Sequence, residues 1–328
     1  MKYGIIGTGW ITEEFIKGAR DICSAEITAV FSRTDKSGKS YCERNNIKSY
    51  YNDFNEFAKA DFDAVYIASP NALHFEQSFF MLQNGKHVIC EKPICVNPEE
   101  YKTCLLEAEK RGLVYLEAIM YMHTPNKEKL FSALKKIGNI TSAHFDFTQL
   151  SSKYSLYKRG ETPNIFNPDL ATGCLMDLGI YCVYPAVDIF GIPESLKSDS
   201  VFLRTGADGS GNASFNYGDK IVTLTYSKTG QNHSGSNIYG DKGTISIESV
   251  SKLINITLTD NNNNKEIICG DMIKSDIMGY EALDFEKFIG NPQDNKYGLC
   301  KKRSLQVSEI MEKMRKEAGI VFRTDKKQ

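Results

Sequence analysis

Short apolar runs alternate with amphipathic stretches over the first 120 residues of the chain. An apolar run of about four to eight residues predicts a buried strand, and apolar residues three and four positions apart predict a helix. The predicted strands are KYGIIG, AEITAVFSR, DFDAVYIASP, KHVICEKP and LVYLEA. The stretches between them, such as LHFEQSFFMLQNG, predict helices. Strands that alternate with helices form βαβ units, so residues 1–120 are predicted to fold as an α/β domain with a doubly wound parallel sheet.

After residue 120, apolar and polar residues alternate one by one along much of the chain. This alternation, interrupted by Asn, Gly and Asp turns, is typical of an open antiparallel sheet. The clearest stretches are NITSAHFDFTQL, SVFLRTG, NASFNYGDKIVTLTYSK, GTISIES and LINITLTDNNNNKEIICG. Within the last of these, DNNNNK predicts a hairpin turn or a surface loop. Residues 121–328 are therefore predicted to form a second domain of the α+β class, whose final helix, RSLQVSEIMEKMRKEAG, packs back on the first domain.

The 328 residues include 41% hydrophobic and 25% charged residues, as in a soluble globular protein. The net charge of −1 provides no electrostatic footprint for a nucleic acid or an anionic membrane. No apolar run approaches the ~20 residues of a membrane helix. Because the chain enters its first strand directly after Met1 and Lys2, we expect a cytoplasmic protein. The nine cysteines include no CxxC pair, so we expect reduced thiols and no metal site.

The turn between the first strand and the first helix has the sequence GTGWIT. Gly7 and Gly9 have the spacing of the first two glycines in a dinucleotide-binding fingerprint, and Thr12 stands at the third position. Bare backbone at the two glycines would let a pyrophosphate approach the amides at the start of the helix. The candidate cofactor contacts are Gly7, Thr8, Gly9, Trp10 and Ile11. The alternative is a tight turn that binds no ligand.

The end of the second predicted strand indicates which dinucleotide would bind. NAD sites place an acidic residue there, where it binds the ribose 2′-hydroxyl. Here the strand ends in Ser32 and Arg33, and Lys36 follows; a hydroxyl and two cations suit a 2′-phosphate. The sequence therefore favours NADP, while the nearby Asp35 keeps NAD possible. Arg33 and Lys36 are alternatively solvated loop charges.

Three further stretches form a set with GTGWIT: SPNALH at 69–74, GKHVICEKP at 85–93 and GCLMDLGIY at 173–181. In this order and spacing, the set resembles the Gfo/Idh/MocA oxidoreductase family over nearly the whole chain. It is most similar to the branch that contains glucose–fructose oxidoreductase, NADP-dependent xylose dehydrogenase and dimeric dihydrodiol dehydrogenase. That branch has a tyrosine where the inositol dehydrogenase branch has a histidine, and Tyr181 stands in that place.

The resemblance implies a Rossmann domain in which the nicotinamide lies across the ends of the parallel strands. It also implies that the exposed face of the second domain's sheet joins subunits, as a homodimer or homotetramer. Lys92 would lie near the nicotinamide and the substrate, and the Lys92–Pro93 bond is often cis in the family. Further cofactor contacts are expected at Ser69, Pro70, Asn71, His74 and Glu91. Asn71 is alternatively a turn-forming residue, and His74 a purely structural one.

Asp177 and Tyr181 are four positions apart, so on a helix they share one face. A tyrosine with its ordinary pKa of about 10 is a poor base near neutral pH, and a nearby lysine ammonium favours the phenolate. We expect a substrate C–H to deliver hydride to the nicotinamide while Tyr181 accepts the hydroxyl proton. Lys92 would tune Tyr181 and hydrogen-bond the reacting oxygen, and Asp177 would orient the substrate or Lys92. The alternatives are a surface lysine, a structural aspartate cap and a core tyrosine.

The segment that leads into the Asp177 helix, SSKYSLYKRGETPNIFNPDLATG, resembles the substrate-proximal segment of the family. Its candidate substrate contacts are Arg159, Phe166 and Asn167, because an aromatic face and hydrogen-bonding side chains suit a polyol or a cyclic diol. The family usually has three glycines before this helix, whereas this chain has Ala171, Thr172 and Gly173. This departure changes the pocket relative to the family pattern.

The sequence therefore predicts an NADP-dependent dehydrogenase or reductase that acts on a CH–OH group of a sugar, a polyol or a cyclic diol. Its expected partners are a small-molecule substrate and copies of itself, with no nucleic acid and no membrane. One alternative keeps the fold but not the catalysis, as an NADP-binding sensor or regulatory protein. Another is an enzyme that holds NAD(P) tightly and transfers hydride between two sugars or cleaves a glycosidic bond.

Overall fold

The computed structural model describes residues 1–323 and 325. It divides into two compact units, Met1–His123 with Ile273–Leu305 and Thr124–Met272 with Gln306–Gln328. The predicted domains, 1–120 and 121–328, differ from these units mainly at residues 273–305, which belong to the first unit. The sequence reading assigned no helix to residues 274–290, and this segment forms a helix that packs on the first helix of the chain.

The sheet of the first unit has six strands in the order β3-β2-β1-β4-β5-β6. Its neighbouring strands are all parallel, which confirms the predicted doubly wound sheet. The strands are β1 (Lys2–Ile6), β2 (Glu26–Phe31), β3 (Ser49–Tyr51), β4 (Ala64–Ile67), β5 (His87–Glu91) and β6 (Tyr115–Ala118). The sequence reading omitted β3 because it has only three residues, all half-buried. The strand order reverses between β1 and β4, which is where ligands bind in sheets of this kind.

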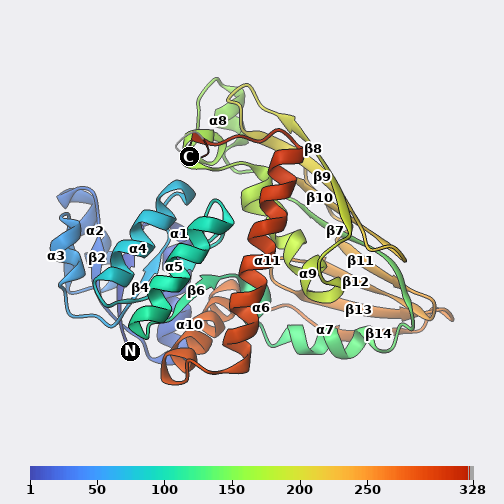
Figure 1. Cartoon of the computed structure of the whole chain (residues 1–328), viewed down its shortest axis with the longest axis horizontal. Coiled ribbons are helices and arrows are strands. Elements are labelled where there is room, and N and C mark those ends of the chain that lie inside the picture. The colour runs from blue at the N-terminus through green and yellow to red at the C-terminus, as the bar shows by residue number, and fades with distance from the viewer. Residues whose placement is uncertain (324, 326–328) are drawn as a thin grey trace. The chain divides into compact units, whose positions relative to one another are not determined.

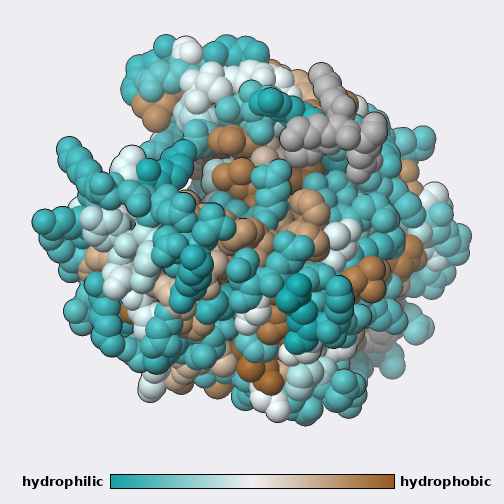
Figure 2. Space-filling view, turned by 60° about the vertical axis from the view of Figure 1, so that its left-hand side comes forward, coloured by the Kyte–Doolittle hydropathy of each residue, from teal (hydrophilic) through white to brown (hydrophobic). Residues whose placement is uncertain are grey.

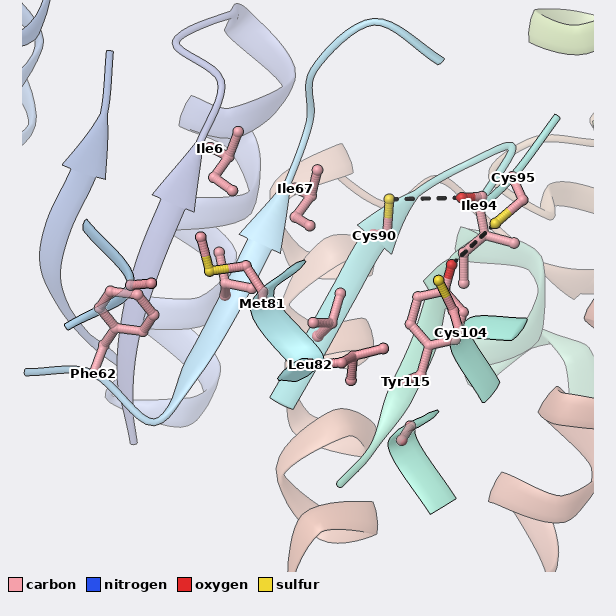
Figure 3. Close-up of a cluster of buried hydrophobic side chains, with 14 of the residues drawn as sticks. Ile6, Phe62, Ile67, Met81, Leu82, Cys90, Ile94, Cys95, Cys104 and Tyr115 are labelled. Carbon is pink, nitrogen blue, oxygen red and sulfur yellow. Dashed lines mark hydrogen bonds between the residues drawn. The ribbon is translucent and has the colours of Figure 1, made fainter. Parts of the chain in front are cut away.

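Helices connect these strands and enclose an apolar core. They are α1 (Trp10–Cys23), α2 (Asp35–Asn45), α3 (Phe54–Ala58), α4 (His74–Gln83), α5 (Pro98–Arg111), α6 (Met120–His123) and α10 (Lys274–Gly290), with a 3-10 turn at Asn71–Leu73. The caps follow from the sequence: Asn97 accepts a hydrogen bond from the N–H of Glu100, and Gly112 ends α5 in the left-handed conformation. Figure 3 shows the core, in which Met81 and Leu82 of α4 and Cys104 of α5 pack against the sheet.

The sheet of the second unit has eight strands in the order β14-β13-β12-β11-β7-β10-β9-β8. The strands are β7 (Ile140–Thr148), β8 (Ser195–Phe202), β9 (Asp208–Asn216), β10 (Ile221–Ser227), β11 (Ser236–Gly240), β12 (Gly243–Ser249), β13 (Ile254–Asp260) and β14 (Lys265–Cys269). The predicted antiparallel sheet is confirmed except at its centre, where β7 and β10 pair in parallel. Alternation predicts a strand but not the direction of its neighbour. The sequence reading also omitted β11 and began β8 too late.

One face of this sheet is covered by helix. Figure 1 shows α9 (Ile180–Phe190) on the face formed by β7 and β10, and α7 (Asn126–Leu134) beside β13 and β14. Alternate residues of β7 and β10, such as Phe145 and Leu224, are buried toward α9. One turn of π-helix (Leu175–Gly179) precedes α9. The other elements of this unit are α8 (Tyr154–Lys158) and 3-10 turns at Asn164–Phe166 and Pro168–Leu170.

The final predicted helix is longer than expected. It forms α11 (Asn295–Glu317), whose first residues belong to the first unit and whose residues from Gln306 onward belong to the second. Within residues 1–323 and 325, no helix combines the length and apolar character needed to cross a membrane. The surface in Figure 2 is largely hydrophilic, with hydrophobic residues in small groups.

The contact between α1 and α10 requires glycine on both helices. A Cβ added at Gly18 would overlap the carbonyl oxygen of Ser275 and lie 2.6 Å from the amide nitrogen of Gly279. A Cβ added at Gly279 would lie 2.6 Å from the carbonyl oxygen of Gly18. The two helix backbones are therefore in direct contact, and this contact fixes α10 on the first unit.

We expect Gly18→Ala to lower the free energy of unfolding by roughly 1–3 kcal/mol, because it overpacks this contact. Gly298→Ala is the matched control, since Gly298 is exposed on α11 and an added Cβ there meets no atom within 4 Å. The control should raise the free energy of unfolding by up to about 1 kcal/mol. Urea unfolding measures both variants, and equal effects would contradict the close contact.

Candidate active site

The two fingerprint glycines have different physical roles. Gly7 has φ = 111°, and a Cβ there would overlap the carbonyl oxygen of Ala68 at the end of β4. Gly9 precedes α1 with an ordinary φ of −86°, and a Cβ there would meet no atom within 4 Å. The fold itself therefore requires Gly7 but not Gly9. What Gly9 provides is an open approach to the first amides of α1, which is what an anionic ligand needs.

The residues around these glycines form the rest of the turn. Thr12, at the third fingerprint position, is fully buried, so its small side chain fits the contact between helix and sheet. Trp10 is 64% exposed, and the ammonium of Lys274 from α10 lies 4.5 Å from its ring centroid. Thr8 and Ile11 are half-buried. A large aromatic ring at the surface beside this glycine turn is available to contact a ligand.

The end of β2 presents two cations. Arg33 and Lys36 are exposed at the start of α2, and the side chain of neither forms a hydrogen bond or an ion pair with any of the described residues. Asp35 lies between them but accepts a 2.8 Å hydrogen bond from the side-chain amide of Asn52. Ser32 is buried, and its hydroxyl donates to the carbonyl of Thr34 at 3.1 Å. Ser32 therefore shapes the loop, while the two cations remain available to an anion.

His74 links two loops at the same edge of the sheet. Its Nδ1 lies 2.8 Å from the carbonyl oxygen of Pro93 and its Nε2 lies 2.8 Å from the carbonyl oxygen of Ser69. Burial lowers the pKa of His74, against these two carbonyls, which raise it. The ring thus joins the loop after β4, which also contains Pro70 and Asn71, to the turn after β5. Both ring nitrogens are occupied by backbone, so His74 acts here as a positioning residue.

Lys92 follows β5 in a turn with a cis Lys92–Pro93 bond, as the resemblance implied. Its backbone N–H donates to the carboxylate of Glu91 at 3.3 Å, and the hydroxyl of Tyr66 donates to the same carboxylate at 2.7 Å. Burial raises the pKa of Glu91, and the charge of Lys92 opposes that rise. Glu281 of α10 is a second buried carboxyl, whose pKa is raised well above its usual range by burial and by repulsion from Glu91.

The residues after Lys92 anchor this turn in the core (Figure 3). The N–H of Ile94 donates to the buried carboxylate of Glu117 at 3.0 Å. The thiol of Cys95 lies 3.2 Å from the hydroxyl of Tyr115. All nine cysteines lie within the described residues, and each is a thiol rather than half of a disulfide. Lys92 is therefore held from both sides, by buried contacts of Glu91 and of Ile94.

In the second unit, Asp177 and Tyr181 lie on consecutive turns. Asp177 is in the π-helical turn, and Tyr181 is in the first turn of α9. π-helical turns are rare in proteins, but those that do occur often lie at functional sites. Tyr181 is 7% exposed, and its ring meets the ring of Phe147 edge-on at 5.4 Å between centroids. The side chain of Asp177 is 32% exposed and forms an ion pair with Lys228.

Two charged residues at this site were missed by the sequence reading. Lys228, directly after β10, is 2% exposed and pairs with Asp177. Asp208, at the start of β9, is fully buried and accepts a 2.6 Å hydrogen bond from the N–H of Leu175. A Cβ at Gly173 would overlap the Asp208 carboxylate, so glycine is needed there. Both charges sit at strand ends, where charged residues are commonly solvated, so the sequence carried no signal for them.

The predicted substrate contacts have local partners. Phe166 is fully buried, with its ring centroid 5.6 Å from that of Tyr157. The side-chain oxygen of Asn167 accepts a 3.1 Å hydrogen bond from the N–H of Asp169. Arg159 is exposed and lies 3.5 Å from Glu161. Phe166 and Asn167 thus stabilise the fold of their own segment, while Arg159 is on its surface.

Residues 1–118 match the GFO_IDH_MocA model, described as an oxidoreductase family with an NAD-binding Rossmann fold, and residues 132–246 match the GFO/IDH/MocA C-terminal domain. The chain is 36% identical over 326 residues to the scyllo-inositol 2-dehydrogenase (NADP(+)) IolU of Bacillus subtilis, covering 99% of each.

More distant similarities point the same way. The chain is 26% identical over 346 residues to the trans-1,2-dihydrobenzene-1,2-diol dehydrogenase of Homo sapiens, covering 100% of this chain and 99% of the relative. Its fold is similar to that of KijD10, a 3-ketoreductase from Actinomadura kijaniata whose crystal structure contains NADP and TDP-benzene. The TM-score is 0.84 at 20% identity, with 97% and 98% of the two chains covered.

Asp208 leads to a prediction about stability. Burial raises the pKa of Asp208 to about 6, against its hydrogen bonds and Lys228, which lower it. A carboxyl with a raised pKa binds its proton more tightly in the folded state, so stability falls as pH rises from about 4 to 6. A shift of about two units corresponds to about 3 kcal/mol. Asp208→Asn should remove this fall, as measured by urea unfolding across that pH range.

The control is Asp260→Asn in the β13–β14 turn, where hydrogen bonds from Asn264 lower the pKa of Asp260. A lowered pKa stabilises the folded state above the ordinary pKa of about 3.8, and this effect is lost as pH falls below it. This control should therefore leave the stability profile between pH 4 and 6 nearly unchanged. Parallel stability profiles for the wild type and Asp208→Asn would contradict the buried state of Asp208.

Proposed function

The chain belongs to the Gfo/Idh/MocA oxidoreductase family, and we propose that it is an NADP-dependent dehydrogenase or reductase of cyclic polyols or diols. The reaction is transfer of hydride between the nicotinamide and a carbinol carbon. The observation that carries the proposal is the arrangement at the first unit's sheet edge: an open glycine approach to α1, followed by two unpaired cations after β2. The family assignment itself agrees with the one made from the four sequence motifs.

The residues present fit a phosphorylated dinucleotide. Gly9 leaves space over the amides of α1 for a pyrophosphate. Arg33 and Lys36 provide the charge for a 2′-phosphate, and Asp35, the residue that would favour NAD, is engaged by Asn52. The NADP(+) in the name of the Bacillus subtilis relative supports the same choice.

When bound, the nicotinamide supplies the hydride chemistry. The chain's own residues would handle the proton and orient the substrate. Tyr181 is the proposed acceptor of the hydroxyl proton in the oxidative direction, and Lys92 the proposed donor to the reacting oxygen. Asp177 is the proposed acceptor for a substrate hydroxyl, since its side chain is 32% exposed and a carboxylate accepts hydrogen bonds.

The names of two relatives support a narrower substrate class. A scyllo-inositol dehydrogenase and a trans-1,2-dihydrobenzene-1,2-diol dehydrogenase are named for rings that carry adjacent hydroxyl groups. We therefore propose a cyclic compound with adjacent hydroxyls as substrate, with inositols first. In its broader form, the same proposal includes sugars as substrates.

We also propose a cytoplasmic homodimer or homotetramer that associates through the sheet face opposite α9. That face carries mostly hydroxyl and amide side chains, together with exposed Ile221 and Tyr239. The free-thiol state of the nine cysteines suits a reducing compartment. The mass of the purified protein in solution tests the assembly.

We expect Arg33→Ala to weaken NADPH binding about 10- to 100-fold, because it removes a charge-assisted contact to the 2′-phosphate. NADH binding should stay unchanged. Lys39→Ala, an exposed lysine further along α2, is the matched control and should leave both affinities as they are. Fluorescence titration with the two nucleotides measures this, and equal loss for both would contradict the NADP assignment.

Tyr181→Phe should lower kcat for NADP⁺-dependent oxidation of scyllo-inositol or another cyclic diol about 10²- to 10⁴-fold, because it removes the proton acceptor. NADPH affinity should stay at the wild-type value. Tyr280→Phe, at a half-buried tyrosine on α10, is the control and should keep full turnover. A wild-type protein that binds NADPH but oxidises no polyol, sugar or diol would instead favour a sensor, and retained turnover in Tyr181→Phe would exclude the proposed role.

A further inference from the structure

We propose that Lys228 is a positioning residue for the reaction, which holds the carboxylate of Asp177 in place on the π-helical turn. This inference rests on the proposed function, because it assigns Lys228 a part in that reaction. It adds a residue from the sheet to a site otherwise formed by helix and loop residues. Lys228 would act through Asp177 and would not touch the substrate.

The first observation is the burial of a charged lysine. Lys228 is 2% exposed, and its ammonium pairs with Asp177. A buried ammonium without a partner is very costly, so the pair must persist in the folded state. The backbone of Lys228 is held on both sides: its N–H donates to Gly209 at 2.9 Å, and its carbonyl accepts from the N–H of Ser151 at 2.9 Å. The cation is therefore fixed relative to the sheet.

The second observation is that the two side chains of the pair differ in solvent exposure. The side chain of Asp177 is 32% exposed, whereas that of Lys228 is 2% exposed. The lysine thus lies behind the carboxylate, on the protein side. A carboxylate has about four lone-pair sites, so it can accept from Lys228 and still accept from a ligand hydroxyl.

The third observation is the construction of the turn that carries Asp177. The N–H of Leu175 donates to the buried Asp208 at 2.6 Å, and Gly173 leaves room for that carboxylate. Lys228 also interacts electrostatically with Asp208 and with the thiol of Cys174. The turn is consequently attached to β9 through Asp208 and to the end of β10 through Lys228. Two buried charges from the sheet fix the place of one half-exposed carboxylate.

The molecule contains a matched pair for comparison. Lys127 of α7 lies 2.8 Å from Asp188 of α9, with side chains 14% and 3% exposed. This pair is also lysine–aspartate, is also largely buried and involves the same helix as Tyr181. Its acid is buried rather than half-exposed, so it should serve the fold alone.

The test compares Lys228→Met with Lys127→Met in the full-length protein, using NADP⁺ and scyllo-inositol or whichever cyclic diol the wild type oxidises best. Lys228→Met should lower kcat about 10²-fold, as expected for a misplaced group, with NADPH affinity unchanged. Lys228→Arg should restore part of kcat. Lys127→Met should keep kcat within about twofold, which follows if it affects only the fold.

A double-mutant cycle shows whether Lys228 acts through Asp177. In the background of Asp177→Asn, adding Lys228→Met should change kcat by less than about threefold. This pair of variants also serves if Lys228→Met alone fails to fold, since the double variant removes both members of the Lys228–Asp177 pair. Losses in kcat that multiply, or wild-type kcat in Lys228→Met, would overturn the inference.

Failure of the proposed function gives a different result. In that case the wild type would bind no NADPH or oxidise no member of the substrate panel. The Lys228–Asp177 pairing is then tested by urea unfolding of the same four proteins. Lys228→Met should lower the free energy of unfolding markedly less in the Asp177→Asn background than in the wild type. Equal costs in the two backgrounds would overturn the inference independently of any activity.

Discussion

The backbone of Gly7 lies against the carbonyl of Ala68, and the arrangement of the first unit's sheet edge depends on this approach. Any Cβ at Gly7 would overlap that carbonyl, so β1 and β4 could not end side by side with another residue there. The contact lies where the strand order reverses, with β2 on one side and β5 on the other. It therefore brings the start of α1, the cations after β2 and the loop after β4 to one edge, the edge at which open α/β sheets bind ligands.

The remaining contacts of this edge hold loops rather than strands. His74 connects the carbonyls of Ser69 and Pro93, and Glu117 accepts from the N–H of Ile94. Each of these side chains is buried, and each takes up backbone groups that would otherwise be unsatisfied. Their effect is to fix the direction of Lys92 without contacting a ligand. A site on loops becomes rigid in this way, because buried polar residues replace the hydrogen bonds that a strand or helix would supply.

Local patterns predicted the parts of the structure that depend on neighbouring residues. The parallel sheet follows from the alternation of apolar runs and amphipathic stretches over residues 1–120, and the glycine turn follows from a few consecutive residues. The Lys92–Pro93 turn was implied by the family resemblance. What could not be predicted depends on pairing across the sheet. Lys228 reaches Asp177, 51 positions away, only because β10 lies beside β7 under the π-helical turn. Alternation cannot give strand direction, so the parallel pairing of β7 with β10 was missed for the same reason. Phe166 could not be assigned from the sequence for a different reason. An aromatic residue in a polar segment is equally consistent with a ligand contact and with a place in the local core.

The candidate site of the first unit has cations without anionic partners, whereas that of the second unit has a lysine paired with an aspartate. This difference fits the two ligands of the proposed reaction. After β2, Arg33 and Lys36 have no anionic partner among the described residues, so this surface has positive charge to offer. A dinucleotide with a 2′-phosphate carries several negative charges and would supply the missing partners.

At the π-helical turn, by contrast, Lys228 neutralises Asp177. A cyclic polyol is uncharged, and a site with a net charge would attract ions and water in its place. A carboxylate backed by a buried cation instead presents strong hydrogen-bond acceptors with little net field, which suits recognition of hydroxyl groups.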